Sequence, residues 1–513
     1  MNPIYRKCHR ISFVNYFRNT STMPLKNDIV SHHVIKNAKK FVDIPRMKRW
    51  EIVLRFLPKG KYYGLGLNEM HRMINEEYGN IVKMPSLFGK PEMIFSYNDS
   101  DNETILRNES KKPYRYSFEP MKYFREKIRP DVYGGEYGSI ASEHGDRWYK
   151  IRTLVNPVML QPKMVQRYTA SINDITLDFI NYILTRDISN QMSNRDLNLW
   201  SLESIANITL DRRLGLFNNN TNGDVAAEKM IDLIRRFFIM CVDFEVSPSI
   251  WKYYHTKAFK EYINVNNDLL NIVMNYIEAT IEETRENKAG KVENVNGIFQ
   301  QLLKIDKRVA IIMAVDSMIA GIDTTASAIT GILYCLAKNP EKQEKLREEI
   351  LKTILTSELN AKSLSNLPYL RACIKEGMRL YPPVSGTSRK TDVDLTLSNY
   401  FIPKGTYVVT WPQLFYRLEN IFPHSNKYLP ERWIKSKEQK CPQLNQSTKF
   451  HFLPFGHGVR SCVGRRFANI EMEILLINLL RRFKIEWNGD DLQIRSAFVN
   501  IPSGNVNFTL SKL

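Results

Sequence analysis

The stretch 308–336 is apolar on nearly every face, which constrains the fold more than any other feature of the chain. A helix that is hydrophobic all round has to be surrounded by protein, so this one is predicted to run through the middle of a large body. Its end is marked by Asn339-Pro340, where Asn339 can cap the next helix and Pro340 can occupy its first position. Within the stretch, 320–325 carries a glycine, a carboxylate and two hydroxyls, which disfavour a buried helix and so indicate a functional role.

The rest of the chain is predicted to be mainly α with a small β part. Helical periodicity dominates 160–350 and 465–483. Short strands are expected at 81–84 and 91–95, and a sheet with hairpin connections at 395–409, with a turn at 402–406. Because no repeat, Gly/Ser linker or low-complexity tract divides the chain, 36–513 is predicted to form a single large domain.

Composition narrows the class of protein. Hydrophobic residues make up 43% and charged residues 25% of the 513 residues, which excludes a disordered chain and a multispanning membrane protein. The net charge of +19 fits nucleic acid, an anionic membrane surface or an acidic protein partner, and does not choose among them. Six scattered cysteines argue against a disulfide framework or a zinc ribbon and favour a reducing compartment.

The first 35 residues read as a mitochondrial transit peptide. Five cations and several hydroxyl residues precede the first acid, Asp28. The alternative is a disordered basic tail. No run of 18 or more consecutive apolar residues is present to act as an anchor helix, so any membrane contact is expected to be peripheral.

A glycine-rich turn at 455–464 runs into an apolar-periodic helix and places Cys462 at the N-terminus of that helix. The helix dipole and free backbone N–H groups favour the thiolate there. A single cysteine is more often a small buried hydrophobe. A nucleophile would need a neighbouring base and zinc would need three more ligands, and His457 supplies neither. Haem iron needs only one strong axial thiolate.

This segment resembles the haem-binding signature of the cytochrome P-450 family, which is matched by Phe455, Gly456, Gly458, Arg460, Cys462 and Gly464. The resemblance implies the cytochrome P-450 fold, a haem b (iron protoporphyrin IX) cofactor and Cys462 as the axial ligand of the iron. Other family motifs follow in the family's order. The residues that match partners of the haem propionates are Trp148, Arg152, Arg389 and Arg460.

The family's structural ion network is matched by Glu376 and Arg379, spaced i, i+3 on one helix, and by Arg432. By this resemblance the three residues lock the cysteine loop and take no part in the chemistry.

The residues Ala320, Gly321, Asp323 and Thr324 match the family's oxygen-activation motif. The resemblance implies that Gly321 leaves room for O2, that Thr324 hydrogen-bonds it and that Asp323 relays protons from outside. Ala320 and Gly321 are also expected to line the haem.

Two pairs of cations bear on the electron donor. Arg371 and Lys375 are i, i+4 neighbours that point about 90° away from the Glu376 face, so both are expected to be exposed. Arg465 and Arg466 stand in a first helical turn, where cations are mildly unfavourable. They resemble the positions at which mitochondrial members dock an adrenodoxin-like two-iron ferredoxin, itself fed by an NADPH ferredoxin reductase. The alternatives are a diflavin reductase as donor, and ordinary solvated charges.

The chain is thus predicted to be a haem-thiolate monooxygenase on the matrix side of the mitochondrial inner membrane, in peripheral contact with it and without nucleic acid. The segments 155–163 and 320–340 look most like insect mitochondrial, xenobiotic-metabolising members. The expected substrate is a lipophilic foreign compound such as an insecticide, or an ecdysteroid or other sterol, in an apolar pocket formed by 114–137, 384–387 and 498–499. Two alternatives stay open: a haem-thiolate isomerase or dehydratase that needs no external electrons, and a haem sensor or carrier without turnover.

Overall fold

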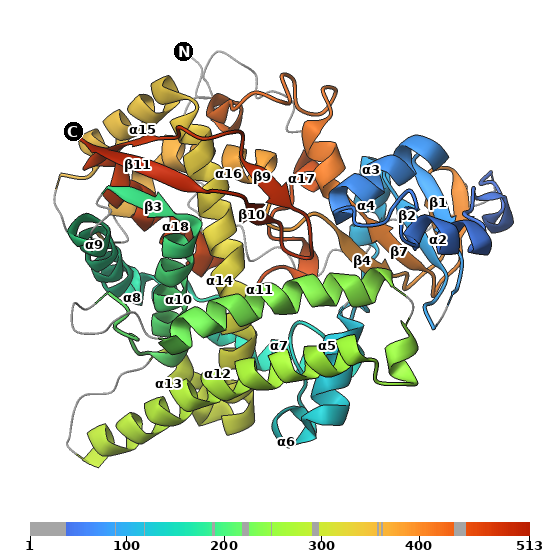
Figure 1. Cartoon of the computed structure of the whole chain (residues 1–513), viewed down its shortest axis with the longest axis horizontal. Coiled ribbons are helices and arrows are strands. Elements are labelled where there is room, and N and C mark those ends of the chain that lie inside the picture. Colours follow the sequence, from blue (N-terminus) through green and yellow to red (C-terminus); the bar gives the residue numbers. More distant parts are fainter. Residues whose placement is uncertain are drawn as a thin grey trace, which may run out of the picture.

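The computed structural model describes residues 37–513, apart from 88, 117, 187–189, 218–224, 248, 290–296, 356–358, 361–362 and 435–447. The transit peptide predicted at 1–35 lies outside the described residues. Most of the described chain is helical and its strands gather in small sheets, as the sequence predicts (Figure 1).

The long helix α14 (Lys307–Ala337) runs through the centre of the molecule and confirms the prediction for 308–336. Asp306 caps its first turn by accepting hydrogen bonds from the N–H groups of Arg308 (2.7 Å) and Val309 (3.2 Å). By length and composition α14 could cross a membrane, but 72% of its most apolar window is buried inside the protein. It is therefore the core helix of a large folded body.

The start of the next helix differs in one detail from the prediction. Pro340 is the first residue of α15 (Pro340–Thr353) and Asn339 precedes it. The Asn339 side chain does not cap α15, however, because its amide donates instead to the Cys335 carbonyl of α14 (2.7 Å).

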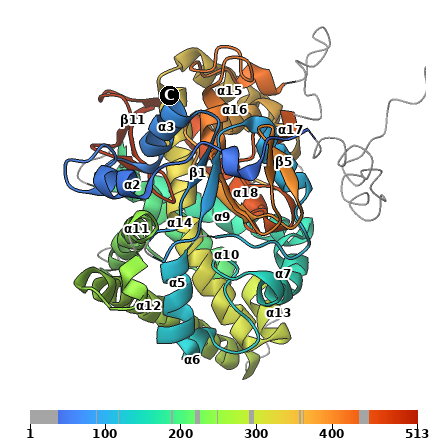
Figure 2. The same ribbon diagram turned by 90° about the vertical axis from the view of Figure 1, so that its right-hand side faces the viewer.

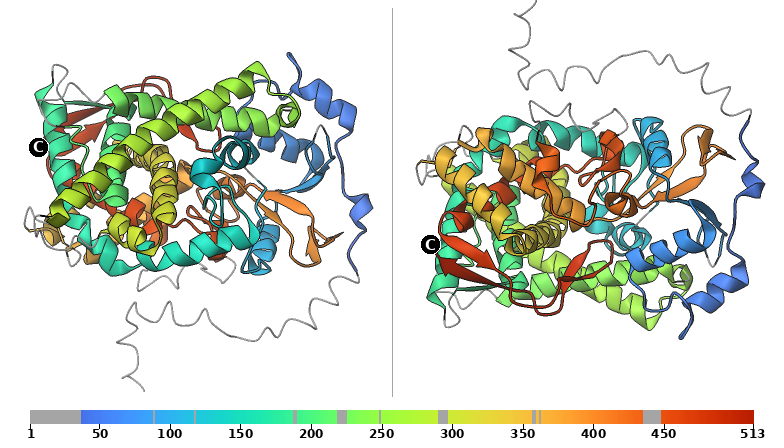
Figure 3. Two further views of the ribbon diagram at one scale, coloured as in Figure 1. Left: turned by 90° about the horizontal axis from the view of Figure 1, so that it is seen from below. Right: turned by 90° about the horizontal axis from the view of Figure 1, so that it is seen from above.

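Other helices enclose α14. α10 (Asn194–Leu210) packs along it and is buried over almost its whole length. α11 (Val225–Val246) and α12 (Lys257–Ala289) lie side by side across it (Figure 3). α9 (Thr169–Thr185) and α18 (Arg465–Leu480) pack against each other. The remaining helices are α2 (Arg49–Phe56), α3 (Leu67–Tyr78), α4 (Asp99–Arg107), α5 (Glu119–Tyr123), α6 (Pro130–Tyr133), α7 (Gly145–Met159), α8 (Pro162–Arg167), α13 (Ile298–Ile305), α16 (Pro368–Leu380) and α17 (Thr448–His451).

A four-stranded sheet lies at one side of the body, with α14 behind it in Figure 2. Its order is β1 (Ile81–Met84), β2 (Met93–Ser96), β7 (Tyr407–Thr410) and β4 (Thr387–Lys390). β2 and β7 are parallel, with Met93 opposite Tyr407, and the other two pairings are antiparallel. The strands predicted at 81–84 and 91–95 are thus present.

The segment 395–409 forms strands, but they do not belong to one sheet. β5 (Leu395–Leu397) and β6 (Tyr400–Ile402) form a separate hairpin, whereas β7 joins β2 and β4. The turn between β6 and β7 is held by Thr391, whose carbonyl accepts the Gly405 N–H (2.9 Å) and whose hydroxyl accepts the Thr406 N–H (3.0 Å). This long-range contact redirects the chain after Ile402.

Two small sheets near the C-terminus have no counterpart in the sequence analysis. β3 (Gln191–Ser193), β11 (Asn507–Lys512) and β8 (Phe483–Glu486) form one sheet, and β9 (Gln493–Arg495) and β10 (Ile501–Ser503) form the other. Strands of three to six residues give little periodic signal, and the pairing of Asn507 with Ser193 spans most of the chain. The turn between β9 and β10 reaches the cavity described next.

Candidate active site

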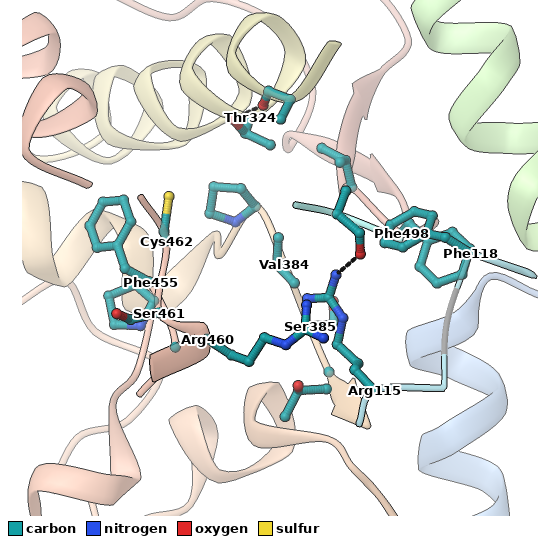
Figure 4. Close-up of a pocket in the computed structure, with 18 of the residues that line it drawn as sticks. Arg115, Phe118, Thr324, Val384, Ser385, Phe455, Arg460, Ser461, Cys462 and Phe498 are labelled. Atoms are coloured by element: carbon teal, nitrogen blue, oxygen red, sulfur yellow. Dashed lines mark hydrogen bonds between the residues drawn. The ribbon is translucent and has the colours of Figure 1, made fainter. Parts of the chain in front are cut away.

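A cavity of about 570 Å³ lies between α14 and the loop that carries Cys462 (Figure 4). One wall is the face of α14 formed by Ala320, Gly321 and Thr324. The three segments expected to form a pocket all contribute, through 115–116, 118, 121, 384–387 and 498–499. The rings of Phe118 and Phe498 pack against each other at a tilt of 31°, with their centres 4.5 Å apart. The cavity therefore has two parts. The polar part beside Cys462 is called the lower cavity, and the apolar, aromatic part that includes Phe118 and Phe498 is called the upper cavity.

The Cys462 loop is shaped by local backbone geometry. Gly456 and Gly458 adopt positive φ values of 70° and 67°, which L side chains rarely adopt. The Cys462 N–H donates to the Phe455 carbonyl (2.9 Å), and α18 begins three residues further on. Of the cysteines in the described part of the chain, Cys462 alone has an accessible side chain, because its sulfur faces the cavity, which itself lies within the protein.

Opposing effects act on the Cys462 thiol. Burial raises its pKa, whereas the N–H groups of Gly464 and Arg465 and the charges of Arg152 and Arg465 lower it. A metal cation at the sulfur would deprotonate the thiol outright. The position thus suits a thiolate ligand more than a free nucleophile, for which a neighbouring base would be needed.

Four cations and an indole surround the lower cavity: Arg115, Arg152, Arg389, Arg460 and Trp148. Burial, together with the charges of Arg115 and Arg389, lowers the pKa of Arg460 to about 8, and burial also lowers the pKa of Arg115 to about 10. Several of their buried donors find no hydrogen-bond acceptor among the described residues, namely Nε of Arg115, Arg152 and Arg460 and Nε1 of Trp148. Unsatisfied cationic donors beside a cysteine thiol fit a ligand with carboxylates, as the haem propionates would supply.

Arg389 differs from the other three arginines. It forms a buried ion pair with Glu109 and donates to the Thr387 hydroxyl (2.7 Å). Glu109 also lies against the Cys462 loop, since a Cβ on Gly458 would be 2.7 Å from its carboxylate. Arg389 is thus fixed by the protein itself, and Arg115 supplies a cation that the sequence analysis did not include.

On α14, the side chains of the motif 320–325 divide between two directions. The Thr324 hydroxyl donates to the Ala320 carbonyl (2.6 Å) and lines the cavity. The Ser201 hydroxyl of α10 donates to the Gly321 carbonyl (3.2 Å), and a Cβ on Gly321 would lie 2.7 Å from the Ile205 side chain. Gly321 is therefore required by the close approach of α10, a reason the sequence analysis did not see.

Asp323 is 2% exposed and is not among the residues that line the cavity. Its Oδ2 has no hydrogen-bond partner within the described chain. Burial raises its pKa to about 7, and the charge of Arg235 on α11 acts in the opposite direction. The carboxyl therefore exchanges its proton near neutral pH and lies toward α11, behind the cavity wall.

The predicted ion network is present and buried. Glu376 pairs with Arg379 (2.8 Å) and Arg432 (2.9 Å) and accepts the Trp433 indole N–H (2.8 Å). Arg379 in turn donates to three carbonyls, at Tyr416 (2.6 Å), Ser425 (2.7 Å) and Lys427 (3.1 Å). The network thus ties α16 to the chain that leads into the Cys462 loop.

The four cations expected at the surface differ in their exposure and in their partners. Lys375 and Arg465 are exposed, and Arg466 is partly buried. Arg371 is not free, because its guanidinium donates to Glu473 of α18 (3.2 Å) and to the Ser365 carbonyl (3.0 Å). Helical spacing correctly placed Arg371 off the Glu376 face, but it could not show that α18 packs there.

Glu471 on α18 is a further group that the sequence analysis missed. It is 2% exposed, lines the cavity, and its Oε1 has no partner in the part of the chain described here. Burial raises its pKa to about 8, so the carboxyl is largely protonated at neutral pH. An acid within the apolar-periodic stretch after Cys462 was the signal that could have identified it.

Comparison with known proteins agrees with this geometry. The cytochrome P450 family model matches residues 45–506. "Probable cytochrome P450 12b2, mitochondrial" of Drosophila melanogaster is 37% identical over 492 residues, which cover 93% of this chain and 90% of that protein. "Cytochrome P450 CYP12A2" of Musca domestica is 35% identical over 92% of this chain and 91% of that protein.

The solved structure "Retinoic acid bound cyanobacterial CYP120A1" superposes with a TM-score of 0.70, at 20% identity, over 91% of this chain and 99% of that one. At this identity the likeness concerns the fold. Together with a family model that spans most of the chain and fly relatives above 30% identity, it shows that the chain belongs to the cytochrome P450 family and is a haem-dependent monooxygenase of the insect mitochondrial type.

Proposed function

We propose that this cytochrome P450 inserts one oxygen atom of O2 into a lipophilic small molecule, with electrons from an adrenodoxin-like ferredoxin. The observation that carries the proposal is that one cavity brings together Cys462, Thr324 and the aromatic rings of Phe118 and Phe498, which face it from different sides (Figure 4). A foreign compound such as an insecticide is the first substrate class, and an ecdysteroid or other sterol is the second.

Cys462 would hold the haem iron, and Trp148, Arg152, Arg389 and Arg460 would hold the propionates, with Arg115 as an additional partner. The unsatisfied donors of Arg115, Arg152, Arg460 and Trp148 support this assignment. Bound haem supplies the oxygen-activating centre. The protein's part is to neutralise the propionates, keep the thiolate in place and exclude water from the apolar upper cavity.

Thr324 and Asp323 would divide the handling of protons. The Thr324 hydroxyl lines the cavity, donates to the Ala320 carbonyl, and can redirect its O–H from that carbonyl to a ligand. Asp323, with a pKa of about 7, can take up and release a proton near neutral pH. Because Asp323 lies behind the cavity wall, a proton from Asp323 has to reach Thr324 along α14.

Lys375 and Arg465 are proposed as docking cations, with Arg466 beside them. The exposure of Lys375 and Arg465 supports this role, since an acidic ferredoxin would be attracted to positive charge at the surface. Arg371 would act indirectly, by holding α16 against Glu473. An NADPH ferredoxin reductase would reduce the ferredoxin.

We further propose that residues 1–35 direct the chain into the matrix, where it contacts the inner membrane peripherally. Exposed apolar side chains support the contact. They are Trp50 (58%) and Leu54 on α2 with Leu57 directly after it, next to Lys48 and Arg49, and Ile250, Tyr253 (84%) and Tyr254 between α11 and α12. Aromatic and basic side chains of this kind are favoured at an anionic membrane surface. Removal of residues 1–35 should stop import into isolated mitochondria, and import of the shortened chain would contradict this assignment.

The substrate class is tested by titrating the holoenzyme with insecticides and with ecdysteroid precursors while following the Soret band. Compounds that shift the band are then incubated with ferredoxin, its reductase and NADPH, and oxygen consumption and product are measured. Cys462→Ser is the control and should lose the red-shifted Soret band of the reduced carbonyl complex. Product formed without reductant would support an isomerase or dehydratase instead.

A further inference from the structure

Glu245 places a carboxylate in the apolar upper part of the cavity. It stands in the last turn of α11 and lines the cavity together with Phe237 and Phe238 of the same helix. Tyr116 and Phe118 from the facing segment line the same region. A carboxylate among aromatic side chains loses the hydration that it has in water, so it requires hydrogen-bond donors.

Among the described residues, the backbone N–H groups of Phe118 and Glu119 bind this carboxylate and favour its ionised form. Its Oε1 accepts the Glu119 N–H (3.1 Å), at the start of α5, where Phe118 has a positive φ of 60°. Burial raises the pKa of Glu245 against the nearby charge of Lys90. Because an ionised carboxyl group can accept about four hydrogen bonds, it retains acceptor capacity toward the cavity.

Two other polar side chains that line the cavity, Asp316 and His71, are already engaged. Asp316 pairs with Arg125 (2.6 Å) and accepts the Ser139 hydroxyl (2.8 Å). The His71 ring bonds to the Tyr97 hydroxyl (2.9 Å) and stacks on Trp411. These groups are part of the wall, whereas Glu245 has capacity for a ligand.

The charges around Glu245 indicate what kind of donor fits. The Lys90 ammonium donates to the carbonyls of Phe244 (3.1 Å) and Glu245 at the end of α11. The Lys252 ammonium lies 3.5 Å from the Glu119 carboxylate. Two lysines therefore balance two glutamates, and a ligand cation would add an unbalanced buried charge. A neutral donor, such as a hydroxyl group, carries no such cost.

We propose that Glu245 binds a hydroxyl group of the substrate, so that the cavity selects lipophilic molecules with a hydroxyl at the end held by α11. The inference rests on the proposed function and narrows its substrate class. The aromatic walls bury the hydrocarbon part, and the hydrogen bond to Glu245 fixes which end of the molecule lies toward α11.

The test compares three rigid ligands of one shape: 5α-androstane, its 3β-alcohol and its 3β-amine. Binding to the ferric holoenzyme is measured by equilibrium dialysis, which requires neither a spectral change nor turnover. We expect the alcohol to bind roughly tenfold more tightly than the hydrocarbon. Failure of ferredoxin-driven turnover would contradict the proposed function and leave this measurement unaffected.

Glu245→Ala should abolish the preference for the alcohol and leave the affinity for the hydrocarbon within about twofold. Glu245→Gln keeps an acceptor oxygen for the Glu119 N–H and should retain a reduced preference of roughly threefold, since a neutral acceptor forms the weaker bond. This second variant keeps the test decisive if the alanine variant does not fold. Glu119→Gln is the matched control, because Glu119 lies near the same lysines but does not line the cavity, and it should keep the full preference.

Equal binding of the alcohol and the hydrocarbon by the unmodified enzyme would overturn the proposal. An undiminished preference for the alcohol in both Glu245 variants would do so as well. Tightest binding of the amine would show that Glu245 recognises a cation instead of a hydroxyl group.

Discussion

The Arg460 guanidinium lies 3.9 Å from the centre of the Trp148 ring, and both side chains line the cavity near Cys462. The ring face attracts the cation and partly replaces its lost hydration. The same guanidinium donates to the carbonyls of Ile140 (3.3 Å) and Pro113 (3.1 Å), while its Nε has no acceptor in the described chain. The arrangement holds several buried cations close together and is stabilised when an anion binds among them.

This relationship gives a prediction for Arg115, whose charge lowers the pKa of Arg460. Arg115→Gln removes one of the mutually repelling cations, so the protein without haem should be at least as stable as the unmodified one. The haem complex should lose a charged hydrogen bond, worth about 1.5–3 kcal/mol. The rise in melting temperature on haem binding should therefore shrink.

Lys112→Gln is the control for Arg115→Gln, because Lys112 is an exposed cation three residues away that pairs with Asp146. It should leave the haem-dependent rise unchanged. An unchanged rise in Arg115→Gln as well would show that Arg115 does not contact the propionates.

Glu471 should make stability depend on pH. Its pKa of about 8 in the folded protein lies above the ordinary value of 4.5, so the folded state keeps a proton that the unfolded state releases. The free energy of unfolding should fall as the pH rises from 4.5 to 8. Glu471→Gln removes this contribution. The free energy of unfolding of the variant, relative to that of the unmodified protein, should therefore increase across this pH range by at most about 1.4 kcal/mol per pH unit.

Urea denaturation at pH values across this window measures the effect. Glu341→Gln changes an exposed carboxylate and should follow the unmodified protein at each pH. Parallel curves for Glu471→Gln and the unmodified protein would mean that the Glu471 carboxyl is ionised in the folded state.

Substitutions of Thr324 and Asp323 should impair turnover in different ways. Thr324→Ala removes a hydroxyl that lines the cavity, so haem and substrate should still bind while electrons are diverted to hydrogen peroxide. Asp323→Asn should lower the rate, and the fall in activity of the unmodified enzyme above about pH 7 should disappear, because the group with a pKa of about 7 is gone. Product, peroxide and NADPH consumption are measured together across the pH range.

Thr325→Ala is the matched control, since it removes the adjacent hydroxyl of the same helix. It should leave product formation coupled to NADPH consumption. Tight coupling in Thr324→Ala would exclude the role of that hydroxyl, and an unchanged pH profile in Asp323→Asn would exclude the proton relay.

The parts of the fold that the sequence predicted are those with a strong local signal. α14 followed from an apolar stretch longer than any other, and the Cys462 loop from glycines whose positive φ values are fixed locally. The ion network of Glu376, Arg379 and Arg432 came from the family resemblance, and helical spacing added that Glu376 and Arg379 share one face of a helix.

The missed features depend on contacts between distant segments. Arg115 stands in a segment without helical or strand periodicity, and only the packed fold brings it near Arg460. The ion pair of Arg371 with Glu473 joins α16 to α18 and is invisible from either helix alone. The short strands β3 and β11 pair across most of the chain for the same reason.

The ferredoxin proposal is best tested on Lys375, because it is exposed whereas Arg371 is engaged with Glu473. Lys375→Glu should weaken ferredoxin-driven turnover several-fold and flatten its dependence on salt, since exposed charges are screened beyond about 10 Å at 0.1 M ionic strength. Substrate binding and peroxide-driven activity should not change. Arg371→Glu should instead lower stability, because it places a carboxylate beside that of Glu473.

Lys404→Glu provides the control, since Lys404 is an exposed cation in the turn between β6 and β7, away from α16. It should leave ferredoxin-driven turnover unchanged at each salt concentration. A diflavin reductase should support little turnover of the unmodified enzyme, because the proposed carrier is the ferredoxin. Full turnover with the diflavin reductase, together with no effect of Lys375→Glu, would reject the ferredoxin as donor and leave the haem chemistry standing.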